Sequence, residues 1–440
     1  FRYRIITNMR IHILGICGTF MAGLAHILKE SGHNVSGSDS QFYPPMSEFI
    51  ERTGISTITG YSAESLPDAD IYVIGNALSR GNESVEYILN NKLPFISGPE
   101  ILGKELKQRN VYAVSGTHGK TTTSYMLAHI LLNQGHDIGY LIGGLSENFP
   151  TSSKLGTDKP FVIEADEYDS AFFDKRSKFL HYSPSNLIIN NIEFDHADIF
   201  DDISDIKKQF HHAIKIIPES GNVIFYRDDI HSKLVIDQGL WCNKIEINSD
   251  EIYLDVTKRE LIVKNEKFSL SDLPLIGDHN FKNYVSAILA ATIENIPIAE
   301  SIKSLQSFNG VRRRMDLVYN SPSLKIFDDF AHHPTAIELS VEAFKEKYPT
   351  KKILGIIELA SNTMSSGFHK EDLIKSLSLL DEYVLLDHYE VYERTSSYQD
   401  LKALLNYVKD NVNQYDIILI MTNKDSQKLI SPLTSYLEEI

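Results

Sequence analysis

Short apolar runs alternate along this chain with longer stretches in which apolar residues recur at helical spacing. The runs of the first hundred residues that read as strands are Arg10–Gly15, His33–Ser38, Asp70–Gly75 and Phe95–Ser97. Between the first two runs, Met21–Ser31 has the spacing of an amphipathic helix. Strands that alternate with helices predict a parallel sheet that is covered by helices on both faces.

The same alternation continues through the rest of the chain. Val111–Ser115, Phe161–Glu164 and Asn186–Asn190 read as buried strands of a second unit, and the alanine-rich stretch His279–Glu294 reads as a helix. Tyr253–Lys267 alternates with a period of two, which predicts a small antiparallel insert. The strands expected in a third unit are Leu324–Phe327, Lys352–Ile357, Glu382–Leu386 and Ile417–Met421.

Two polar stretches separate these units. Gly103–Asn110 is polar and charged, which suits a first linker, and a second linker is expected near Asn309–Gly310. A chain of 440 residues also exceeds what one hydrophobic core usually holds. We therefore predict an α/β protein with mostly parallel sheets and three domains, at residues 9–108, 109–310 and 311–440.

The composition is that of an ordinary globular protein, with 42% apolar and 23% charged residues. No apolar run approaches the roughly 20 residues that cross a bilayer, and no signal-peptide pattern is present. The net charge of -16 argues against a general nucleic-acid surface, although a local cationic pocket can still hold a nucleotide. Cys17 and Cys242 are the only cysteines, which indicates a reducing compartment. We expect the natural chain to begin at Met9, which opens a strand; a natural extension before Met9 is the alternative.

The strongest local motif is Ser115–Thr123, with the sequence SGTHGKTTT. It follows a predicted strand and opens a helix, so its amides can curl around phosphate oxygens at a helix N-terminus. Lys120 would then reach the β- and γ-phosphates, and Thr121 would hold Mg²⁺. The loop is shortened, because Val114 stands where the standard spacing has glycine. A glycine turn that binds nothing is the alternative.

A second glycine turn, Gly15–Met21 with the sequence GICGTFM, follows the first strand. It departs from the dinucleotide-binding fingerprint, which has glycine in place of Cys17, so a plain packing turn is an open alternative. Asp39 follows the next strand, where a carboxylate can contact a ribose. As an alternative, Asp39 is a turn residue within Ser38–Ser40.

Acidic residues follow two of the predicted strands in the second unit. Glu164–Asp169 (EADEYD) stands where a carboxylate ligand of Mg²⁺ would lie beside a phosphate loop, and a solvated acidic loop is the alternative. Glu193–Asp198 (EFDHAD) follows the next strand in the same way. Its His196 could ligate a second metal ion or contact phosphate, or it could be a structural histidine.

Three further groups of polar residues are candidates for nucleotide contacts. Arg312–Arg314 is either a surface charge run or a phosphate clamp, since guanidinium matches phosphate geometry. Asp328–Pro334 (DDFAHHP) is more consistent with ribose and phosphate contacts than with zinc, because adjacent histidines do not easily converge on one metal. In Gly277–Asn283 (GDHNFKN), Asn280 carries the donor and acceptor that suit an adenine edge, with a simple N-cap as the alternative.

Together these motifs resemble those of the Mur ligase family. The shortened phosphate loop, the acidic run, the GDHNFKN helix start and the DDFAHHP cluster occur in family order, and the resemblance extends over nearly all of the chain from Met9. It implies three domains. They are a Rossmann-like UDP-sugar domain, a central P-loop ATPase domain with a mostly parallel sheet, and a mobile Rossmann-like C-terminal domain for the incoming amine.

The resemblance also implies roles for individual residues. Those expected to bind ATP are Gly116, Thr117, His118, Gly119, Lys120, Thr121, Thr122, Asn280, Arg314, Asp329 and His332. Those expected to hold Mg²⁺ are Thr121, Glu164 and His196. Those expected to act in catalysis are Lys120, Glu164, His196 and Arg314. Those expected to meet the UDP-sugar are Gly15, Gly18, Thr19, Phe20, Asp39 and Ser79. Those expected to bind the peptide are Ser361, Asn362, Thr363 and Met364.

Within the family, four stretches look most like members that add a tripeptide to UDP-N-acetylmuramate. The four stretches are Gly15–Met21, Glu164–Lys178, Asn191–Phe200 and Ser361–Met364. They imply ATP- and Mg²⁺-dependent ligation of L-alanyl-γ-D-glutamyl-meso-diaminopimelate through an acyl phosphate, in cytoplasmic recycling of peptidoglycan. The implied partners are small-molecule substrates, with neither nucleic acid nor membrane. The sequence leaves the oligomeric state open.

The chain departs from these members in its last third. Leu359–Ala360 replaces the usual Pro-Arg, Ser365 replaces a lysine, and Thr422–Ser426 replaces a Ser-Asn-Gly-Gly-Phe run. These departures leave two other functions open, a ligase for L-alanine and a nucleotide-binding regulator that has lost ligation. A P-loop kinase or GTPase is disfavoured, because it would not explain the GDHNFKN helix start or the third domain.

Overall fold

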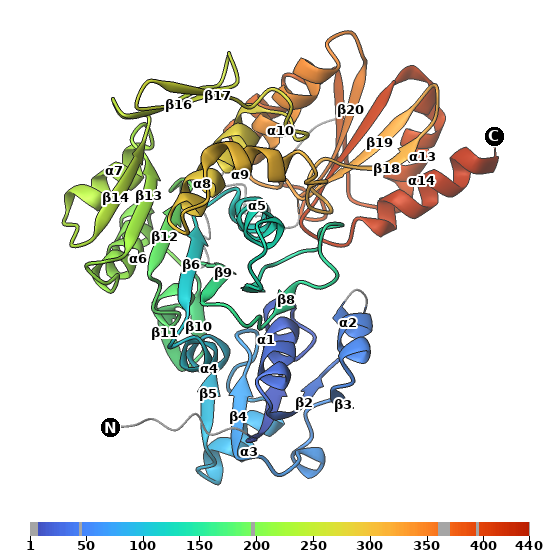
Figure 1. The fold of residues 1–440 in the computed structure, drawn as a ribbon. Helices are drawn as coiled ribbons and strands as arrows, with labels where there is room; N and C mark the ends of the chain where they lie inside the picture. Colours follow the sequence, from blue (N-terminus) through green and yellow to red (C-terminus); the bar gives the residue numbers. More distant parts are fainter. Residues whose placement is uncertain (1–7, 44–45, 195–198, 360–369, 393–395, 440) are drawn as a thin grey trace. The chain divides into compact units, whose positions relative to one another are not determined.

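The computed structural model describes residues 8–43, 46–194, 199–359, 370–392 and 396–439 (Figure 1). It consists of two compact units. The first unit comprises Phe1–Glu193, Ile203–Leu273 and Asn283–Phe308. The second comprises Phe194–Asp202, Pro274–Lys282 and Asn309–Ile440.

The N-terminal part of the first unit is a five-stranded parallel sheet. Its strands are β1 (Arg10–Leu14), β2 (Asn34–Asp39), β3 (Ser56–Thr59), β4 (Ile71–Ile74) and β5 (Phe95–Ser97), in the order β3-β2-β1-β4-β5. The helices between them are α1 (Thr19–Glu30), α2 (Met46–Thr53), α3 (Glu83–Asn90) and α4 (Gly98–Glu105). The strand order reverses at β1, and ligands of such sheets bind at the carboxyl ends of the strands beside this point.

The larger sheet of the first unit surrounds the strand that leads into the phosphate loop. Its strands are β6 (Asn110–Ser115), β7 (Gly139–Leu141), β8 (Ser153–Lys154), β9 (Pro160–Glu164), β12 (Asn186–Ile189), β13 (Asn222–Tyr226) and β14 (Asn243–Ile247). Their order is β14-β13-β12-β6-β9-β7-β8, and all neighbours pair in parallel except β7 and β8. Strand β6 therefore lies between β12 and β9, and the residues that follow these three strands meet at one edge.

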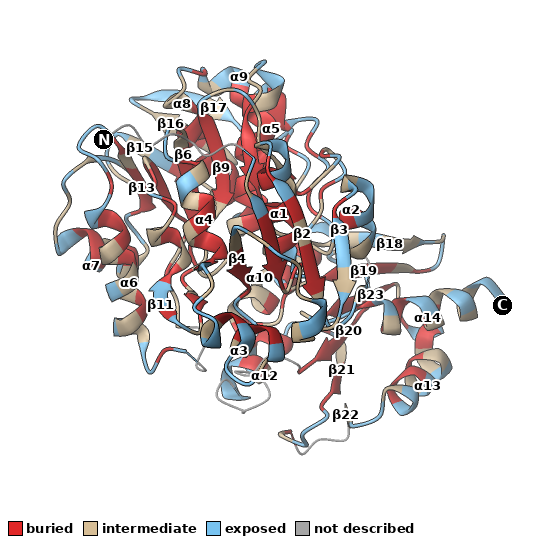
Figure 2. Cartoon of the chain, turned by 90° about the horizontal axis from the view of Figure 1, so that it is seen from below, coloured by how far each residue is buried: buried red, intermediate tan, exposed pale blue. Residues whose placement is uncertain are grey.

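The first unit also contains helices and two separate antiparallel sheets. The helices are α5 (Lys120–Asn133), α6 (Ile203–Lys215), α7 (Ile230–Asp237), α8 (Asp278–Thr292) and α9 (Ile298–Leu305). Helix α8 belongs to this unit from Asn283 onward. The antiparallel strands are β10 (Asp169–Ala171) with β11 (Asp174–Ser177), and β15 (Ile252–Asp255), β16 (Glu260–Val263) and β17 (Glu266–Ser269). The predicted antiparallel insert is therefore confirmed. Helix α5 is buried over most of its length, which fits its apolar sequence (Figure 2).

The second unit contains a six-stranded sheet in the order β18-β19-β23-β20-β21-β22. Its strands are β18 (Asp316–Asn320), β19 (Lys325–Asp329), β20 (Ile353–Glu358), β21 (Glu382–Leu386), β22 (Ser397–Tyr398) and β23 (Ile417–Met421). Only β18 is antiparallel to its neighbour. Its helices are α10 (Pro334–Lys347), α12 (Lys370–Leu377), α13 (Leu401–Asn411) and α14 (Gln427–Glu439). Helices α10 and α12 pack on one face of the sheet, and helices α13 and α14 pack on the other.

The predicted α/β class with mostly parallel sheets is confirmed. One expectation was wrong in part: the first linker was placed at Gly103–Asn110, but α4 extends to Glu105 and β6 begins at Asn110. Gly103 is packed there, since a Cβ on it would come within 1.9 Å of the carbonyl oxygen of His181. Helix α4 is short and its last residues are polar, so the spacing of its apolar residues does not reveal where it ends. Among the described helices, none is both long and apolar enough to span a bilayer.

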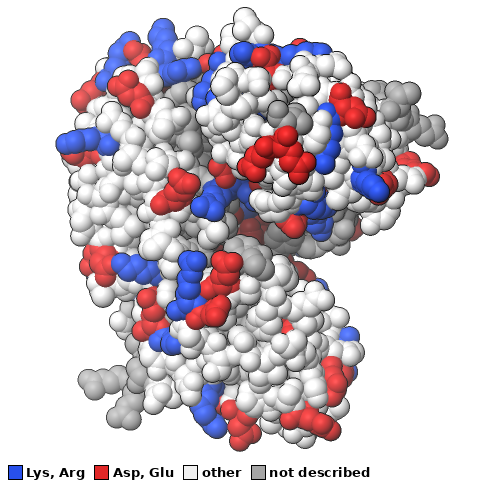
Figure 3. Space-filling model, turned by 90° about the vertical axis from the view of Figure 1, so that its right-hand side faces the viewer, with Lys and Arg blue, Asp and Glu red and all other residues white. Residues whose placement is uncertain are grey.

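Acidic and basic side chains lie interspersed over the face that Figure 3 draws. Charges of both signs therefore lie close to one another on this face, although the whole chain has a net charge of -16. Because the described residues on this face form no large area of positive charge, we expect the cations that bind a phosphate to come from a local pocket.

Candidate active site

The turn Gly116–Gly119 joins the buried strand β6 to helix α5. Both glycines lie in the left-handed region, with φ of 131° at Gly116 and 79° at Gly119. A Cβ on Gly116 would come within 2.9 Å of the carbonyl oxygen of Asn191, and one on Gly119 within 2.3 Å of Oδ1 of Asn283. Conformation and space both require glycine at the two positions.

Residues that follow β12 hold this turn in place. The carbonyl oxygen of Asn191 accepts the N–H of Thr117 at 3.2 Å, and its Oδ1 accepts the N–H of His118 at 2.8 Å. The hydroxyl of Thr117 accepts the N–H of Glu193 at 2.8 Å. Because β12 pairs directly with β6, the ends of two adjacent strands fix the turn.

Lys120, the first residue of α5, folds its side chain back over the turn. Its Nζ donates to the carbonyl oxygen of Gly116 at 2.7 Å. The same Nζ lies 3.7 Å from Oδ1 of Asp166 and 3.8 Å from Oε2 of Glu167, and the side chain is 12% exposed. An ammonium group held beside a glycine turn at a helix N-terminus favours a bound phosphate.

Thr121 and Glu164 bring oxygen donors together beside Lys120. The hydroxyl of Thr121 donates to Oε1 of Glu164 at 2.7 Å, and Oε2 accepts the N–H of Gly143 at 2.7 Å. Burial, reinforced by the charge of Asp166, raises the pKa of Glu164 above its usual range. A cation would stabilise this carboxylate, and hydroxyl and carboxylate oxygens are ligands that Mg²⁺ takes. The donor set fits the metal predicted for these two residues.

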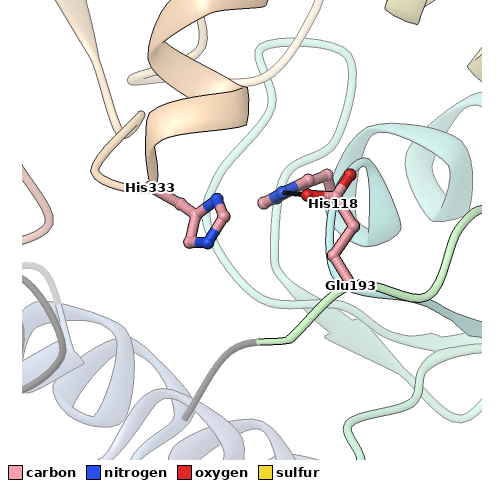
Figure 4. A group of neighbouring side chains, drawn as sticks. All are labelled: His118, Glu193 and His333. Carbon is pink, nitrogen blue, oxygen red and sulfur yellow. Dashed lines mark ion pairs between the residues drawn. The ribbon is translucent and has the colours of Figure 1, made fainter. Parts of the chain in front are cut away.

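His118 and Glu193 form a second polar group at the turn. Nε2 of His118 lies 3.6 Å from Oε2 of Glu193, and Figure 4 shows the ring and the carboxylate close together. The sequence had assigned no role to Glu193. His196, predicted as a metal ligand, lies outside the described residues.

Two asparagines support the start of α5. Nδ2 of Asn190 donates to the hydroxyl of Thr123 at 3.0 Å, and this hydroxyl donates to Oδ1 of Asn283 at 3.2 Å. Both asparagines are almost fully buried. Neither Asn190 nor Asn283 was predicted from the sequence, although Asn283 closes the GDHNFKN motif. The residue predicted from that motif is Asn280, whose Nδ2 donates to the carbonyl oxygen of Ile276 at 2.8 Å.

The first glycine turn is fixed by the last residues of β2. Gly15 has a φ of 82°, and its N–H donates to the carbonyl oxygen of Ser38 at 2.8 Å. Oδ2 of Asp39 accepts the N–H of Cys17 at 2.8 Å, and Oδ1 accepts the hydroxyl of Tyr61 at 3.2 Å. Asp39 therefore shapes this turn, and its predicted contact with the UDP-sugar stays a prediction.

Helix α1 begins directly after this turn. Within the described chain, no side chain caps its N-terminus, and its first turn carries no acidic residue. Gly18 and Thr19 are exposed there, and Phe20 is half-buried. A helix start of this kind attracts anionic groups such as a diphosphate. Ser79 is exposed in the segment that follows β4, the neighbour of β1.

In the second unit, the arginine run and the DDFAHHP cluster meet at the carboxyl end of β19. The guanidinium groups of Arg313 and Arg314 lie 5.1 Å and 4.9 Å from the ring centre of Phe330. Oδ1 of Asp329 accepts the N–H of Ala331 at 2.9 Å. Burial raises the pKa of this carboxyl, while the charge of Arg314 acts in the opposite direction.

Two histidines, His332 and His333, follow Asp329 in the sequence. Nδ1 of His332 lies 2.9 Å from the carbonyl oxygen of Phe330. His333, also drawn in Figure 4, immediately precedes α10. The structure thus brings Arg314, Asp329 and His332 to one strand end within this unit. Their contacts with ATP stay predictions.

A buried carboxylate lies at the carboxyl end of β20. The side chain of Glu358 is 2% exposed, its Oε1 pairs with Nζ of Lys428, and its Oε2 accepts the hydroxyl of Thr422 at 2.6 Å. The predicted peptide-binding residues follow β20 directly but lie outside the described residues. They are Ser361, Asn362, Thr363 and Met364.

Three family models match the chain in succession. They are the Mur ligase family catalytic domain at residues 10–110, the Mur ligase middle domain at 114–291, and the Mur ligase glutamate ligase domain at 313–424. The chain belongs to the Mur ligase family. The resemblance stated from the sequence motifs is therefore confirmed, and the family is one of ligases.

Relatives within the family extend over almost the whole chain. A UDP-N-acetylmuramate–L-alanyl-γ-D-glutamyl-meso-2,6-diaminoheptandioate ligase of Escherichia coli K12 is 43% identical over 94% of this chain and 95% of its own. Its namesake in Haemophilus influenzae is 42% identical over 94% and 96%. A UDP-N-acetylmuramate–L-alanine ligase of Clostridium botulinum is 30% identical over 96% and 94%.

A solved structure of similar length shares the fold. The murein peptide ligase of Psychrobacter arcticus 273-4 has a TM-score of 0.78 and 35% identity, and the match covers 98% of this chain and 99% of the other.

Proposed function

We propose that this protein uses ATP to join the carboxylate of UDP-N-acetylmuramate to the amino group of L-alanyl-γ-D-glutamyl-meso-diaminopimelate, in the recycling of cell-wall peptidoglycan. The observation that carries the proposal is the 43% identity, over 94% of the chain, to a ligase named for this reaction, against 30% for an L-alanine ligase. The phosphate loop with Lys120 over it supports the use of ATP.

The chemistry has two steps. An oxygen of the sugar carboxylate attacks the γ-phosphorus of ATP, which gives an acyl phosphate and ADP. The amine then attacks the acyl carbon, loses a proton and expels inorganic phosphate, leaving an amide. Activation must come first, because a free carboxylate has no good leaving group. Exclusion of water protects the acyl phosphate from hydrolysis.

We assign the residues to these steps as follows. Lys120 and Arg314 would offset the charge that develops on the transferring phosphoryl group. The turn at Gly15–Gly18 would hold the UDP-sugar, and the segment that follows β20 would meet the peptide. Residues 9–108, 109–310 and 311–440 would form the UDP-sugar, ATP and amine domains.

Thr121 and Glu164 would hold Mg²⁺, which neutralises phosphate charge when bound. Their hydroxyl and carboxylate oxygens already lie together at the ends of adjacent elements. Because ATP and nucleotide sugars are intracellular metabolites, we place the reaction in the cytoplasm.

An amine comparison tests the proposal. The purified protein is given ATP, Mg²⁺ and UDP-N-acetylmuramate, and phosphate release is measured with the tripeptide and with L-alanine. Release with the tripeptide, and mass analysis showing the amide product, is expected. Lys120→Ala should abolish it. Faster release with L-alanine would contradict the choice of amine, and release with neither amine would support a regulator without ligase activity.

A further inference from the structure

Lys178 lies near both the acidic run Glu164–Asp169 and the first glycine turn, Gly15–Met21. It begins the short helix η2 (Lys178–Leu180), directly after the hairpin β10–β11, which lies beside α4 (Figure 1). Its side chain is only 13% exposed. Neither the phosphate loop nor the metal pair uses it, so a largely buried ammonium group needs an explanation.

Two aromatic rings enclose this ammonium group. Nζ of Lys178 lies 5.7 Å from the ring centre of Phe20 and 5.4 Å from that of Tyr168. Phe20 belongs to the first turn of α1, directly after the proposed UDP-sugar turn. Contact with two ring faces stabilises a cation while leaving its N–H donors for an anion.

One carboxylate links this lysine to the phosphate loop. Oδ2 of Asp166 lies 3.4 Å from Nζ of Lys178, and Oδ1 lies 3.7 Å from Nζ of Lys120. The two ammonium groups therefore flank Asp166, one beside the sugar turn and the other beside the phosphate turn. The reaction must bring two anions, a sugar carboxylate and a triphosphate, to the space between these turns. Like charges repel there unless cations face both of them.

We propose that Lys178 binds the carboxylate of the sugar acid and positions it for attack on the γ-phosphate. This inference rests on the proposed function. Its N–H donors bond to the carboxylate, and the rings of Phe20 and Tyr168 fix the direction from which the carboxylate approaches. Lys120 neutralises the phosphate in the same way on the other side of Asp166.

Lys178→Met removes the charge and keeps the length of the side chain. Since a hydrogen bond to a charged group contributes about 10-fold to 100-fold to binding, the KM for UDP-N-acetylmuramate should rise by about that factor. The KM for ATP should stay within about 2-fold. Lys178→Arg, which keeps the charge, should restore part of the loss. Lys175→Met is the matched control, because Lys175 lies three residues earlier, on β11, with a side chain 71% exposed, and pairs with Asp169.

Binding measurements distinguish a contact with the carboxylate from contacts with the rest of the UDP-sugar. UDP-N-acetylglucosamine lacks the carboxylate, so calorimetry should show that Lys178→Met weakens binding of UDP-N-acetylmuramate and leaves that of UDP-N-acetylglucosamine unchanged. Equal weakening of both would overturn the inference in favour of a diphosphate contact. Unchanged binding of both, with only a lower unfolding midpoint, would overturn it in favour of a structural role. Wild-type protein that binds both sugars but releases no phosphate would instead refute the proposed function.

Discussion

Gly119→Ala tests whether the phosphate turn is shaped by its packing as well as by its backbone. Gly119 has a φ of 79°, so alanine there costs about 1–2 kcal/mol in conformational energy. The new Cβ would also lie 2.3 Å from Oδ1 of Asn283 and 2.9 Å from Nδ2 of Asn190. Both amides would have to move away from the hydroxyl of Thr123, and each lost hydrogen bond costs about 0.5–1.5 kcal/mol. The sum is a loss of about 2–5 kcal/mol in the free energy of unfolding.

Denaturant unfolding followed by tryptophan fluorescence measures this loss in the unit that contains the turn. Trp241 is the only tryptophan of the chain and belongs to the first unit, which also contains the turn. Gly135→Ala is the matched control, since Gly135 follows the other end of α5 with a φ of 88° and has no atom within 4 Å of its added Cβ. It should cost only the conformational part, about 1–2 kcal/mol. Equal losses in the two variants, with equal affinity for ADP, would refute the packing argument.

Glu164 and Lys428 give two further predictions. Because burial and Asp166 raise the pKa of Glu164, protons compete with Mg²⁺ for its carboxylate. The Mg²⁺ concentration for half-maximal activity should therefore rise as the pH is lowered toward the raised pKa of Glu164. Glu164→Gln should keep only a small residual activity that lacks this dependence, and a dependence that persists in the residual activity would exclude Glu164 as the ligand. Lys428→Met removes the ammonium group that pairs with the buried carboxylate of Glu358, so thermal unfolding should show a loss of about 1–3 kcal/mol. No loss would mean that Thr422 and the ring of His388, 3.8 Å away, satisfy the carboxylate.

Most strands with a buried apolar run were predicted from the sequence, and so was the insert with a period of two, but β13 was missed although it is apolar and buried. Strands β6, β9 and β23 are buried along most of their length, so they read as continuous apolar runs. Strand β3 (Ser56–Thr59) lies at the edge of its sheet and is mostly exposed, so it has no such run. The predicted first linker begins too early, at Gly103, because the last residues of α4 are polar and resemble a linker in the sequence.

The candidate site was predictable where its residues are neighbours in the sequence. The loop that carries Lys120 and Thr121 is one continuous segment, and its glycines mark it. Asn190 and Asn283 reach the same turn from distant parts of the chain, so their positions in the sequence do not indicate that they meet. Lys178 is of this kind as well, since only the fold brings it against Phe20, more than a hundred residues earlier in the sequence.

The most direct test of the central claim is a crystal structure of the protein with Mg²⁺ and a non-hydrolysable ATP analogue. The amides of Gly116–Lys120 should surround the phosphates. Nζ of Lys120 should have exchanged its bond to the carbonyl oxygen of Gly116 for contact with the β- and γ-phosphate oxygens. Phosphates bound elsewhere, or a Lys120 side chain still bonded to Gly116 beside a bound nucleotide, would contradict the claim that this turn holds the ATP.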